Sequence, residues 1–386
     1  MTVTAAEHLA HPQADRSRPL PGVLTDAVRS EAQAAIRAWP GYAPTPLLDL
    51  PGLARRLGLG RIRYKDESGR FGLGSFKALG GAYAVQRLVK RLGGGAGVTF
   101  AAATDGNHGR SVAWGAAQAG ARAVIYLHAG VSPGREAALR ALGAEIVRVA
   151  GNYDDSVRQC ARDAEREGWH VVSDTSWDGY RDTPTAVMAG YSLIAREAVE
   201  QMEAGPSGDR PTHVLVQAGV GGVAAAVCAE LRDAWGADAP RFVVVEPALA
   251  ACLLASARRG VRTEVAIDGE TVMAGLSCGD PSPLAWEILA AGADDFVAVD
   301  DALVAPAMTM LADGVDGDPP VVAGESGVAG LAALLAARDD AGLRDALCLN
   351  ADSRVLLIGT EGATDPDIWR ALVGRAPGEV RAGGAR

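Results

Sequence analysis

Nine short apolar segments alternate with alanine-rich stretches along this 386-residue chain. The segments lie at residues 61–65, 98–104, 123–128, 145–149, 170–174, 213–217, 242–246, 295–299 and 355–359. The chain has 48 glycines, nearly twice the usual share of about 7%, and they gather at the turns between these segments. Helices are expected in the gaps, for example at 132–143 and 152–168. Strands that alternate with helices across short loops are typical of an α/β protein.

Length, composition and charge limit the class of protein. A chain of 386 residues suits one large or two moderate domains, and 48% hydrophobic with 22% charged residues is ordinary for a globular enzyme. The formal net charge of −10 is opposite in sign to the surface that binds nucleic acids or anionic membranes. No run of 18 apolar residues occurs, and residues 1–20 lack an apolar signal segment. We therefore expect a flexible tail at 1–20, no membrane or nucleic-acid partner, and a cytoplasmic location.

Two distant segments carry groups that suit one kind of cofactor. Lys77 is expected on the first turn of a helix, between Phe76 and a run of small apolar residues, which is an unusual setting for a solvated charge. Burial lowers the pKa of an amine and so makes it a better nucleophile. Residues 219–224 (GVGGVA) connect a strand to a helix, where backbone N–H groups bind phosphate. Pyridoxal phosphate carries both an aldehyde for the amine and a phosphate for the turn.

The glycine-rich turn by itself has a second interpretation. It also fits the dinucleotide-binding fingerprint, and Glu246 follows the next strand about where a ribose-binding acid belongs. A nicotinamide-dependent dehydrogenase is therefore the remote alternative. It leaves Lys77 and the GNHG sequence at 106–109 unexplained.

The GNHG turn decides between the two cofactors. A lysine in an x-F-K context, a GNHG turn and a glycine-rich phosphate loop occur here in that order. In this the chain resembles the tryptophan-synthase-β-like group of pyridoxal-phosphate enzymes, also called fold type II, and within it the diaminopropionate ammonia-lyases most closely. The matching segments are 65–81, 104–114, 174–191, 212–224, 272–289, 324–331 and 356–365.

The resemblance implies a fold and a division of the chain. The expected fold is two three-layer α/β domains with mainly parallel sheets. Residues 21–94 and 188–386 would form a large domain that binds pyridoxal phosphate, and residues 95–187 a small one. A homodimer is also implied.

The resemblance further implies which residues hold the cofactor. Lys77 would attach it beside Phe76, Asn107 would hydrogen-bond the ring hydroxyl, and Thr360 would face the pyridine nitrogen. A neutral hydroxyl there leaves the nitrogen largely unprotonated, which favours elimination over transamination. A simple turn residue is the alternative for Asn107, and a strand-end threonine the alternative for Thr360. The phosphate ligands would be the backbone N–H groups of Gly219, Val220, Gly221, Gly222 and Val223.

Two carboxylates are the candidate acid and base groups. Asp105 precedes GNH, where hydroxy-amino-acid dehydratases of the same group usually carry serine. A carboxylate there can pair with a β-ammonium group or act as a base at Cα, and a turn cap is the alternative. Asp174 is implied to lie beside the substrate as a second acid. Tyr153 is either a substrate contact or a packing residue.

These residues imply a lyase that converts 2,3-diaminopropionate, a small amino acid, to pyruvate and ammonia by α,β-elimination. Asp105 would be the base for one enantiomer, and Lys77 or Asp174 for the other. A serine or threonine dehydratase, or a β-replacing synthase, is the alternative on the same fold, because Gly74 and Ser75 replace residues of the family segment FGLNAFK beside the lysine. A cofactor-binding regulator without catalysis is disfavoured, since every catalytic position is filled.

The five cysteines do not suggest a metal site, because none lies in a C-x-x-C pair or in a Cys/His cluster with zinc spacing. Three of them, Cys160, Cys228 and Cys348, are expected as buried hydrophobic residues. Cys252 and Cys278 lie in irregular segments and are candidates for a reversible disulfide, against the rule that cytosolic disulfides are rare.

Overall fold

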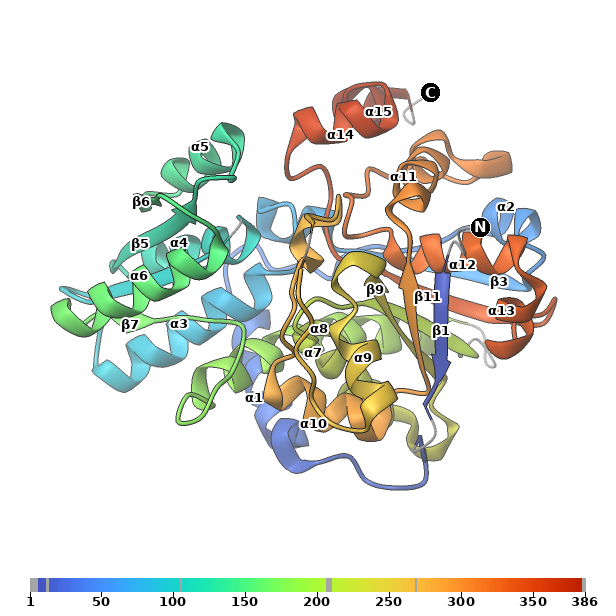
Figure 1. The fold of residues 1–386 in the computed structure, drawn as a ribbon, viewed down its shortest axis with the longest axis horizontal. Coiled ribbons are helices and arrows are strands. Elements are labelled where there is room, and N and C mark those ends of the chain that lie inside the picture. The colour runs from blue at the N-terminus through green and yellow to red at the C-terminus, as the bar shows by residue number, and fades with distance from the viewer. Residues whose placement is uncertain (1–5, 12–13, 105, 206–209, 268, 384–386) are drawn as a thin grey trace. The chain divides into compact units, whose positions relative to one another are not determined.

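The computed structural model describes residues 6–11, 14–104, 106–205, 210–267 and 269–383 (Figure 1). The chain forms two compact units. The larger comprises residues 1–23, 44–69 and 194–386, and the smaller comprises residues 24–43 and 70–193. The boundary between residues 193 and 194 falls inside helix α7 (Asp182–Glu203), so this helix contributes to both units.

The larger unit contains a seven-stranded sheet in the order β1-β10-β9-β8-β11-β3-β2. The five inner strands run parallel, and the two edge strands, β1 and β2, run antiparallel to their neighbours. The strands are β1 (Ala6–Ala10), β2 (Leu47–Asp49), β3 (Arg61–Asp66), β8 (His213–Gln217), β9 (Arg241–Pro247), β10 (Asp295–Val299) and β11 (Arg354–Gly359).

Helices cover both faces of this sheet. Every residue of β8 and of β10 is buried, as expected for inner parallel strands with helices on either side. On one face, a Cβ at Gly330 of α12 would lie 3.1 Å from Leu357 and 3.3 Å from Leu215, so the glycine lets this helix approach the sheet closely. The helices that lie in this unit are α2 (Pro51–Arg56), α8 (Gly222–Trp235), α9 (Cys252–Arg259), α10 (Pro283–Gly292), α11 (Val304–Asp313), α12 (Ala329–Asp339), α13 (Ala341–Ala346), α14 (Pro366–Val373) and α15 (Pro377–Gly383).

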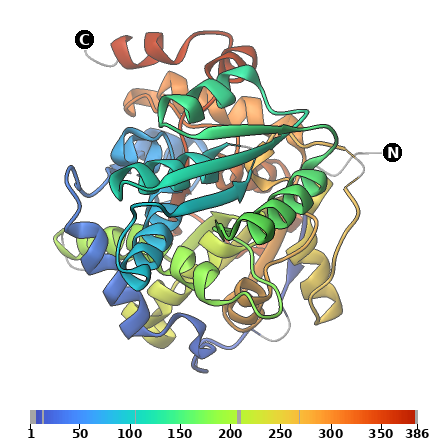
Figure 2. The same ribbon diagram turned by 90° about the vertical axis from the view of Figure 1, so that its left-hand side faces the viewer.

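The smaller unit contains a four-stranded parallel sheet in the order β6-β5-β4-β7 (Figure 2). Tyr126 of β5 packs with Cys160 of α6 on one face. The next residue back, Ile125, faces α4, because a Cβ at Gly109 would lie 3.0 Å from it. Successive residues of a strand point to opposite faces, so the sheet lies between two helical layers. The elements are β4 (Thr99–Ala103), β5 (Arg122–His128), β6 (Glu145–Val149), β7 (His170–Val171), α1 (Asp26–Arg37), α3 (Ala78–Leu92), α4 (Asn107–Gln118), α5 (Pro133–Ala141) and α6 (Tyr153–Glu167).

The predicted α/β fold with mainly parallel sheets is confirmed, and a strand occurs at each of the nine predicted apolar segments. The two edge strands β1 and β2 were not predicted. β1 lies within residues 1–20, where a flexible tail was expected, so that expectation is wrong for residues 6–10. It pairs with β10, and His8 Nε2 lies 2.8 Å from Asp295 Oδ1, a partner 287 residues away that leaves no local pattern. Residues 1–5 and 12–13 lie outside the described residues.

The two units divide the chain differently from the predicted domains. Residues 24–43 and 70–94 were assigned to the large domain, but they group with the four-stranded sheet. The reason is the close approach of α3 to α4: a Cβ at Gly81 would lie 1.9 Å from Ser111 Oγ, and one at Gly115 only 2.7 Å from Ala82 Cα. Glycine at these two positions lets the helix backbones touch.

None of the helices in the described residues combines the length and the apolar content that crossing a membrane requires.

Candidate active site

Lys77 lies at the start of α3 in the smaller unit, as predicted, and serves as the N-cap residue of that helix. Its side chain is a fifth exposed, and its Nζ donates a hydrogen bond to Asp174 Oδ2 at 2.5 Å. Nζ also lies 5.3 Å from the ring centre of Phe76 and 5.9 Å from that of Tyr191. The amine is therefore held by one carboxylate and two aromatic rings, not by an apolar environment alone.

The chain contains only three lysines, and the other two are poor candidates for attaching an aldehyde. Lys65 is fully buried, and its Nζ donates to Thr45 O, Glu197 Oε2 and Gln201 Oε1 at 2.7–3.0 Å. Lys90 is exposed on the last turn of α3. Lys77 is the lysine that combines access with a tightly defined position.

Asp174 follows β7 and is the centre of the charged group in the smaller unit. Burial acts to raise the pKa of this carboxyl, but the charge of Lys77 and the hydrogen bond that Lys77 donates outweigh burial and hold the pKa below its ordinary value. Asp174 Oδ2 lies 3.9 Å from His108 Nδ1. Asp174 is therefore a carboxylate at neutral pH that lies beside Lys77, and its place beside the substrate stays a prediction.

His108 belongs to the GNHG turn, but the motif gave no reason to single it out. Burial lowers the pKa of its imidazole, and its Nε2 lies 2.8 Å from Val172 O. A carbonyl oxygen only accepts, so the neutral ring carries its proton on Nε2 and leaves Nδ1 unprotonated on the side of Asp174. His108 thereby anchors the start of α4 beside the segment that carries Asp174.

Tyr191 of α7 was also not predicted as a site residue. It is 1% exposed, and its ring packs against Phe76 with the ring centres 4.6 Å apart. Burial raises the pKa of its hydroxyl well above the ordinary value. A Cβ at Gly80 would lie 2.4 Å from this ring, so glycine one turn after Lys77 makes room for it. Phe76 and Tyr191 together form an aromatic support for the lysine.

Three further residues of this part of the chain were predicted as site residues. Asn107 is the first residue of α4, next to His108. Asp105 lies outside the described residues. Tyr153 begins α6 and is 39% exposed, and its role as a substrate contact stays a prediction.

Gly74 and Ser75 precede the lysine in the segment that departs from the family sequence FGLNAFK. Gly74 has a φ of 80°, in the left-handed region that glycine adopts without strain and that asparagine tolerates better than other residues. Glycine in place of asparagine therefore preserves the backbone of this loop. Ser75 is buried.

The predicted phosphate-binding turn connects β8 to α8 in the larger unit. Gly221 has a φ of 96° and is the N-cap residue of α8, so the turn requires glycine there. A Cβ at Gly219 would lie 3.2 Å from Leu276 Cα and 3.3 Å from Gly275 O, which leaves space for backbone only. The N-terminus of this 14-residue helix offers backbone N–H groups and the positive end of the helix dipole. These features suit a phosphate group.

Thr360 follows β11 in the same unit and is 3% exposed. Its Oγ1 accepts a hydrogen bond of 2.6 Å from Nε2 of Gln217, the last residue of β8. The neighbouring strands β8 and β11 thus bring the hydroxyl and the start of the phosphate-binding turn to the same end of the sheet. The smaller unit contains an amine, and the larger unit contains an anion-binding turn and a neutral hydroxyl. Each of these groups is of a kind that pyridoxal phosphate binds.

Comparison with known proteins identifies the family. The family model described as "Pyridoxal-phosphate dependent enzyme" matches residues 38–360. The chain belongs to this family. It is 44% identical over 351 residues to diaminopropionate ammonia-lyase of Escherichia coli strain K12, covering 86% of this chain and 88% of the relative. It is 40% identical over 376 residues to the enzyme of the same name from Salmonella typhimurium, covering 91% and 93%.

A solved structure supports the same assignment. The crystal structure of diaminopropionate ammonia-lyase from Escherichia coli in complex with an aminoacrylate-PLP azomethine reaction intermediate matches with a TM-score of 0.89 and 40% identity. The match covers 96% of this chain and 97% of that chain. The predicted fold type II family and its cofactor, pyridoxal phosphate, are thereby confirmed.

Glu246 does not have the position that the dehydrogenase interpretation required. It is fully buried and accepts hydrogen bonds of 2.7 Å from the backbone N–H groups of Leu253 and Leu254, at the start of α9. Burial raises the pKa of this carboxyl to about 8. Both carboxylate oxygens of Glu246 are engaged by the helix, so the residue caps α9 in this pyridoxal-phosphate enzyme and is not exposed to bind a ribose.

Cys252 and Cys278 both lie next to Gly219 of the phosphate-binding turn. Cys252 Sγ donates to Gly219 O at 3.8 Å, and Cys278 Sγ would be 3.1 Å from a Cβ on Gly219. All five cysteines are present as thiols. Cys160 and Cys228 are buried as expected, whereas Cys348 is exposed, so the expectation of burial is wrong for Cys348. A reversible disulfide between Cys252 and Cys278 stays a prediction. Among the described residues, no group of three or more His, Cys, Asp or Glu side chains is arranged to hold a metal ion.

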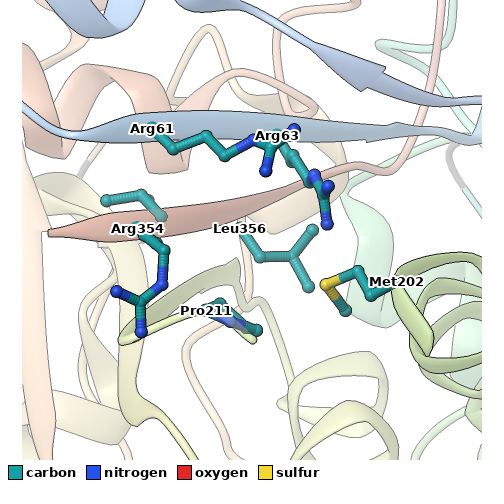
Figure 3. Close-up of a pocket in the computed structure, with 7 residues that line it drawn as sticks. Arg61, Arg63, Met202, Pro211, Arg354 and Leu356 are labelled. Atoms are coloured by element: carbon teal, nitrogen blue, oxygen red, sulfur yellow. The ribbon is translucent and has the colours of Figure 1, made fainter. Parts of the chain in front are cut away.

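A shallow hollow elsewhere in the larger unit is not part of this site (Figure 3). Its residues include Arg61, Arg63 and Arg354 near the beginnings of β3 and β11. Thr360 follows the other end of β11. The hollow therefore lies at the opposite end of these parallel strands.

Proposed function

We propose that the chain is a diaminopropionate ammonia-lyase, which converts 2,3-diaminopropionate and water to pyruvate and two molecules of ammonia. The observation that carries the proposal is the 44% identity to the Escherichia coli enzyme over 86% of the chain. The ion pair between Lys77 and Asp174 supplies the chemistry that such a reaction needs.

Several residues would hold the cofactor. Lys77 would bind its aldehyde carbon beside Phe76, and Asn107 would hydrogen-bond its ring hydroxyl. Thr360 would lie at its ring nitrogen. The backbone N–H groups of residues 219–223 would donate hydrogen bonds to its phosphate. Pyridoxal phosphate, when bound, supplies a ring that accepts electron density from Cα of the substrate.

Lys77 and Asp174 divide the work of proton transfer and charge pairing. A carboxyl group whose pKa is held low by its neighbours is a weak base at neutral pH. Lys77, once the substrate has taken its place, is therefore the group that removes the Cα proton of one enantiomer. Asp174 pairs with the ammonium groups of the lysine and of the substrate. Asp105 removes the proton of the other enantiomer and stabilises the β-ammonium that leaves as ammonia, and Tyr153 contacts the substrate.

The elimination balances without an oxidant or reductant. The Cα–H electrons form the Cα–Cβ double bond as the Cβ–N bond breaks and ammonia departs. Water then supplies the oxygen of pyruvate, and the α-amino nitrogen is released as the second ammonia. Two ammonia per pyruvate distinguish this reaction from a serine dehydratase, which releases one.

Pyruvate and ammonia release from D- and L-2,3-diaminopropionate, measured beside D- and L-serine and threonine, tests the proposal. We expect two ammonia per pyruvate and faster turnover of diaminopropionate than of either hydroxy amino acid. Faster turnover of serine or threonine would assign the chain to the dehydratases. Product formation only after adding a second nucleophile would indicate a β-replacing synthase. Bound cofactor without turnover of any of these would indicate a regulator.

We further propose that the enzyme acts in the cytoplasm as a homodimer, as the resemblance implies. Light scattering on the purified holoenzyme tests the oligomeric state, and a molar mass of a single chain at working concentration would overturn the proposed dimer.

A further inference from the structure

Gln217 is a buried polar residue at the end of β8 that no feature of the sequence singled out. It is 1% exposed. Its side-chain nitrogen, Nε2, lies 2.8 Å from Ile358 O and 2.6 Å from Thr360 Oγ1. Both partners lie at the end of the adjacent strand β11, 141 and 143 residues further along the chain. The parallel pairing of β8 with β11 creates this contact.

The contact with Ile358 fixes the orientation of the amide. A backbone carbonyl oxygen accepts hydrogen bonds and cannot donate them, so the NH₂ group of Gln217 must face it. Turning the amide round would place two acceptor oxygens 2.8 Å apart. Within the described part of the chain, Gln217 Oε1 has no hydrogen-bond partner, so the two contacts of Nε2 hold the amide in this orientation. Both hydrogens of Nε2 are therefore directed at oxygen atoms.

The fixed amide in turn determines what the hydroxyl of Thr360 can do. Its oxygen accepts a hydrogen bond from Gln217 Nε2, so its own hydrogen points elsewhere. At 3% exposure the hydroxyl has almost no access to bulk water. A buried hydroxyl that already accepts one bond is best satisfied by donating to a second acceptor. Thr360 is thereby prepared as a donor.

We propose that Gln217 is a positioning residue that commits the Thr360 hydroxyl to donate its proton to the ring nitrogen of pyridoxal phosphate. The inference rests on the proposed function, which places that nitrogen at Thr360. A nitrogen that accepts this bond stays unprotonated and withdraws less electron density from the substrate. Gln217 thus favours elimination over transamination without touching the cofactor.

Two substitutions test the orientation. Gln217→Glu keeps the size of the side chain. Burial and the carbonyl of Ile358 raise the pKa of the new carboxyl. Above that pKa the carboxylate accepts a hydrogen bond from Thr360, which turns the oxygen lone pair of the hydroxyl toward the ring nitrogen. Gln217→Met removes the donor and leaves the hydroxyl free to rotate. Gln33→Glu is the matched control, because Gln33 is a buried glutamine in α1 whose Nε2 donates to Ser192 Oγ at 2.9 Å.

The readout is the ¹⁵N chemical shift of the ring nitrogen in holoenzyme reconstituted with ¹⁵N-labelled pyridoxal phosphate, recorded across neutral pH. We expect the wild type and Gln33→Glu to give the shift of an unprotonated pyridine throughout. Gln217→Glu should move toward the pyridinium shift, and Gln217→Met should titrate with pH. We also expect elimination to fall by roughly tenfold in both Gln217 variants, about the effect of one hydrogen bond, with pyridoxamine phosphate accumulating as a side product.

A pyridinium shift in the wild type would overturn the proposal, as would an unchanged shift in the Gln217 variants. If Gln217→Glu does not fold, the pH dependence of the ¹⁵N shift in Gln217→Met tests the proposal by itself. Failure of the proposed function is recognised separately, because the chain would then bind the cofactor with the expected ¹⁵N shift yet release no pyruvate from diaminopropionate.

Discussion

The packing beneath Lys77 leaves no space for a methyl group at Gly80. A Cβ there would lie 2.4 Å from Tyr191 Cε1 and 2.7 Å from Val187 Cγ1, whereas carbon atoms in contact stay about 3.5–4.0 Å apart. Tyr191 is 1% exposed, and its ring packs against Phe76. Gly80→Ala therefore forces the ring of Tyr191 against Phe76, the residue before Lys77.

Two opposing effects determine how much Gly80→Ala changes the free energy of unfolding. Alanine is favoured over glycine inside a helix by about 1 kcal/mol. Overpacking a closely packed core costs about 1–3 kcal/mol, and an overlap of about 1 Å with a ring that cannot turn away belongs near the upper end. We expect Gly80→Ala to lower the free energy of unfolding by about 1–2 kcal/mol. We expect the binding free energy of pyridoxal phosphate to weaken by a similar amount, which corresponds to a roughly tenfold loss of affinity.

Gly134→Ala is the matched control, because a Cβ in this first turn of α5 meets nothing nearer than Ser132 Oγ at 3.9 Å. It should raise the free energy of unfolding by up to about 1 kcal/mol and leave cofactor affinity unchanged. Urea unfolding of the cofactor-free variants and titration with pyridoxal phosphate measure both quantities. Equal stability and affinity of Gly80→Ala and the wild type would refute the packing argument, and so would equal losses in the two variants.

Three further outcomes are expected. Lys77→Ala should abolish the imine absorbance that borohydride removes and lower turnover by several orders of magnitude; label on Lys65 or Lys90 after reduction would contradict the assignment. Asp105→Asn should retain cofactor and lose about 10²–10⁴-fold in elimination from at least one enantiomer, whereas normal rates with both would make it a turn residue. Asp174→Asn should destabilise the cofactor-free protein at neutral pH. The folded-state pKa of Asp174 is lowered, so its stabilisation is present above the unfolded pKa of about 3.9 and lost as pH falls through the folded value. Unfolding curves at several pH values should show the difference fading below pH ~4, and a difference that grows there would refute the pairing.

The strands that the sequence predicted include β8 and β10, in which every residue is buried. Such strands are short continuous apolar runs, which stand out from the alanine-rich helices around them. The edge strands β1 and β2 lack that pattern, because one is partly polar and the other has only three residues. The boundary of the two units was not predicted either, since it depends on how closely α3 and α4 pack at Gly81 and Gly115.

The sequence by itself determined the fold class and the cofactor, and it predicts which lysine attaches that cofactor. These features are local properties that neighbouring residues encode: the periodicity of strands and helices, a lysine flanked by apolar residues, and a glycine-rich turn. Only the tertiary structure brought Asp174 to Lys77 across 97 residues and Gln217 to Thr360 across 143. Each of these pairs joins segments distant along the chain, and their contact results from how helices and strands pack. The charge state of a carboxylate and the direction of a hydroxyl proton depend on such contacts, which no local pattern records.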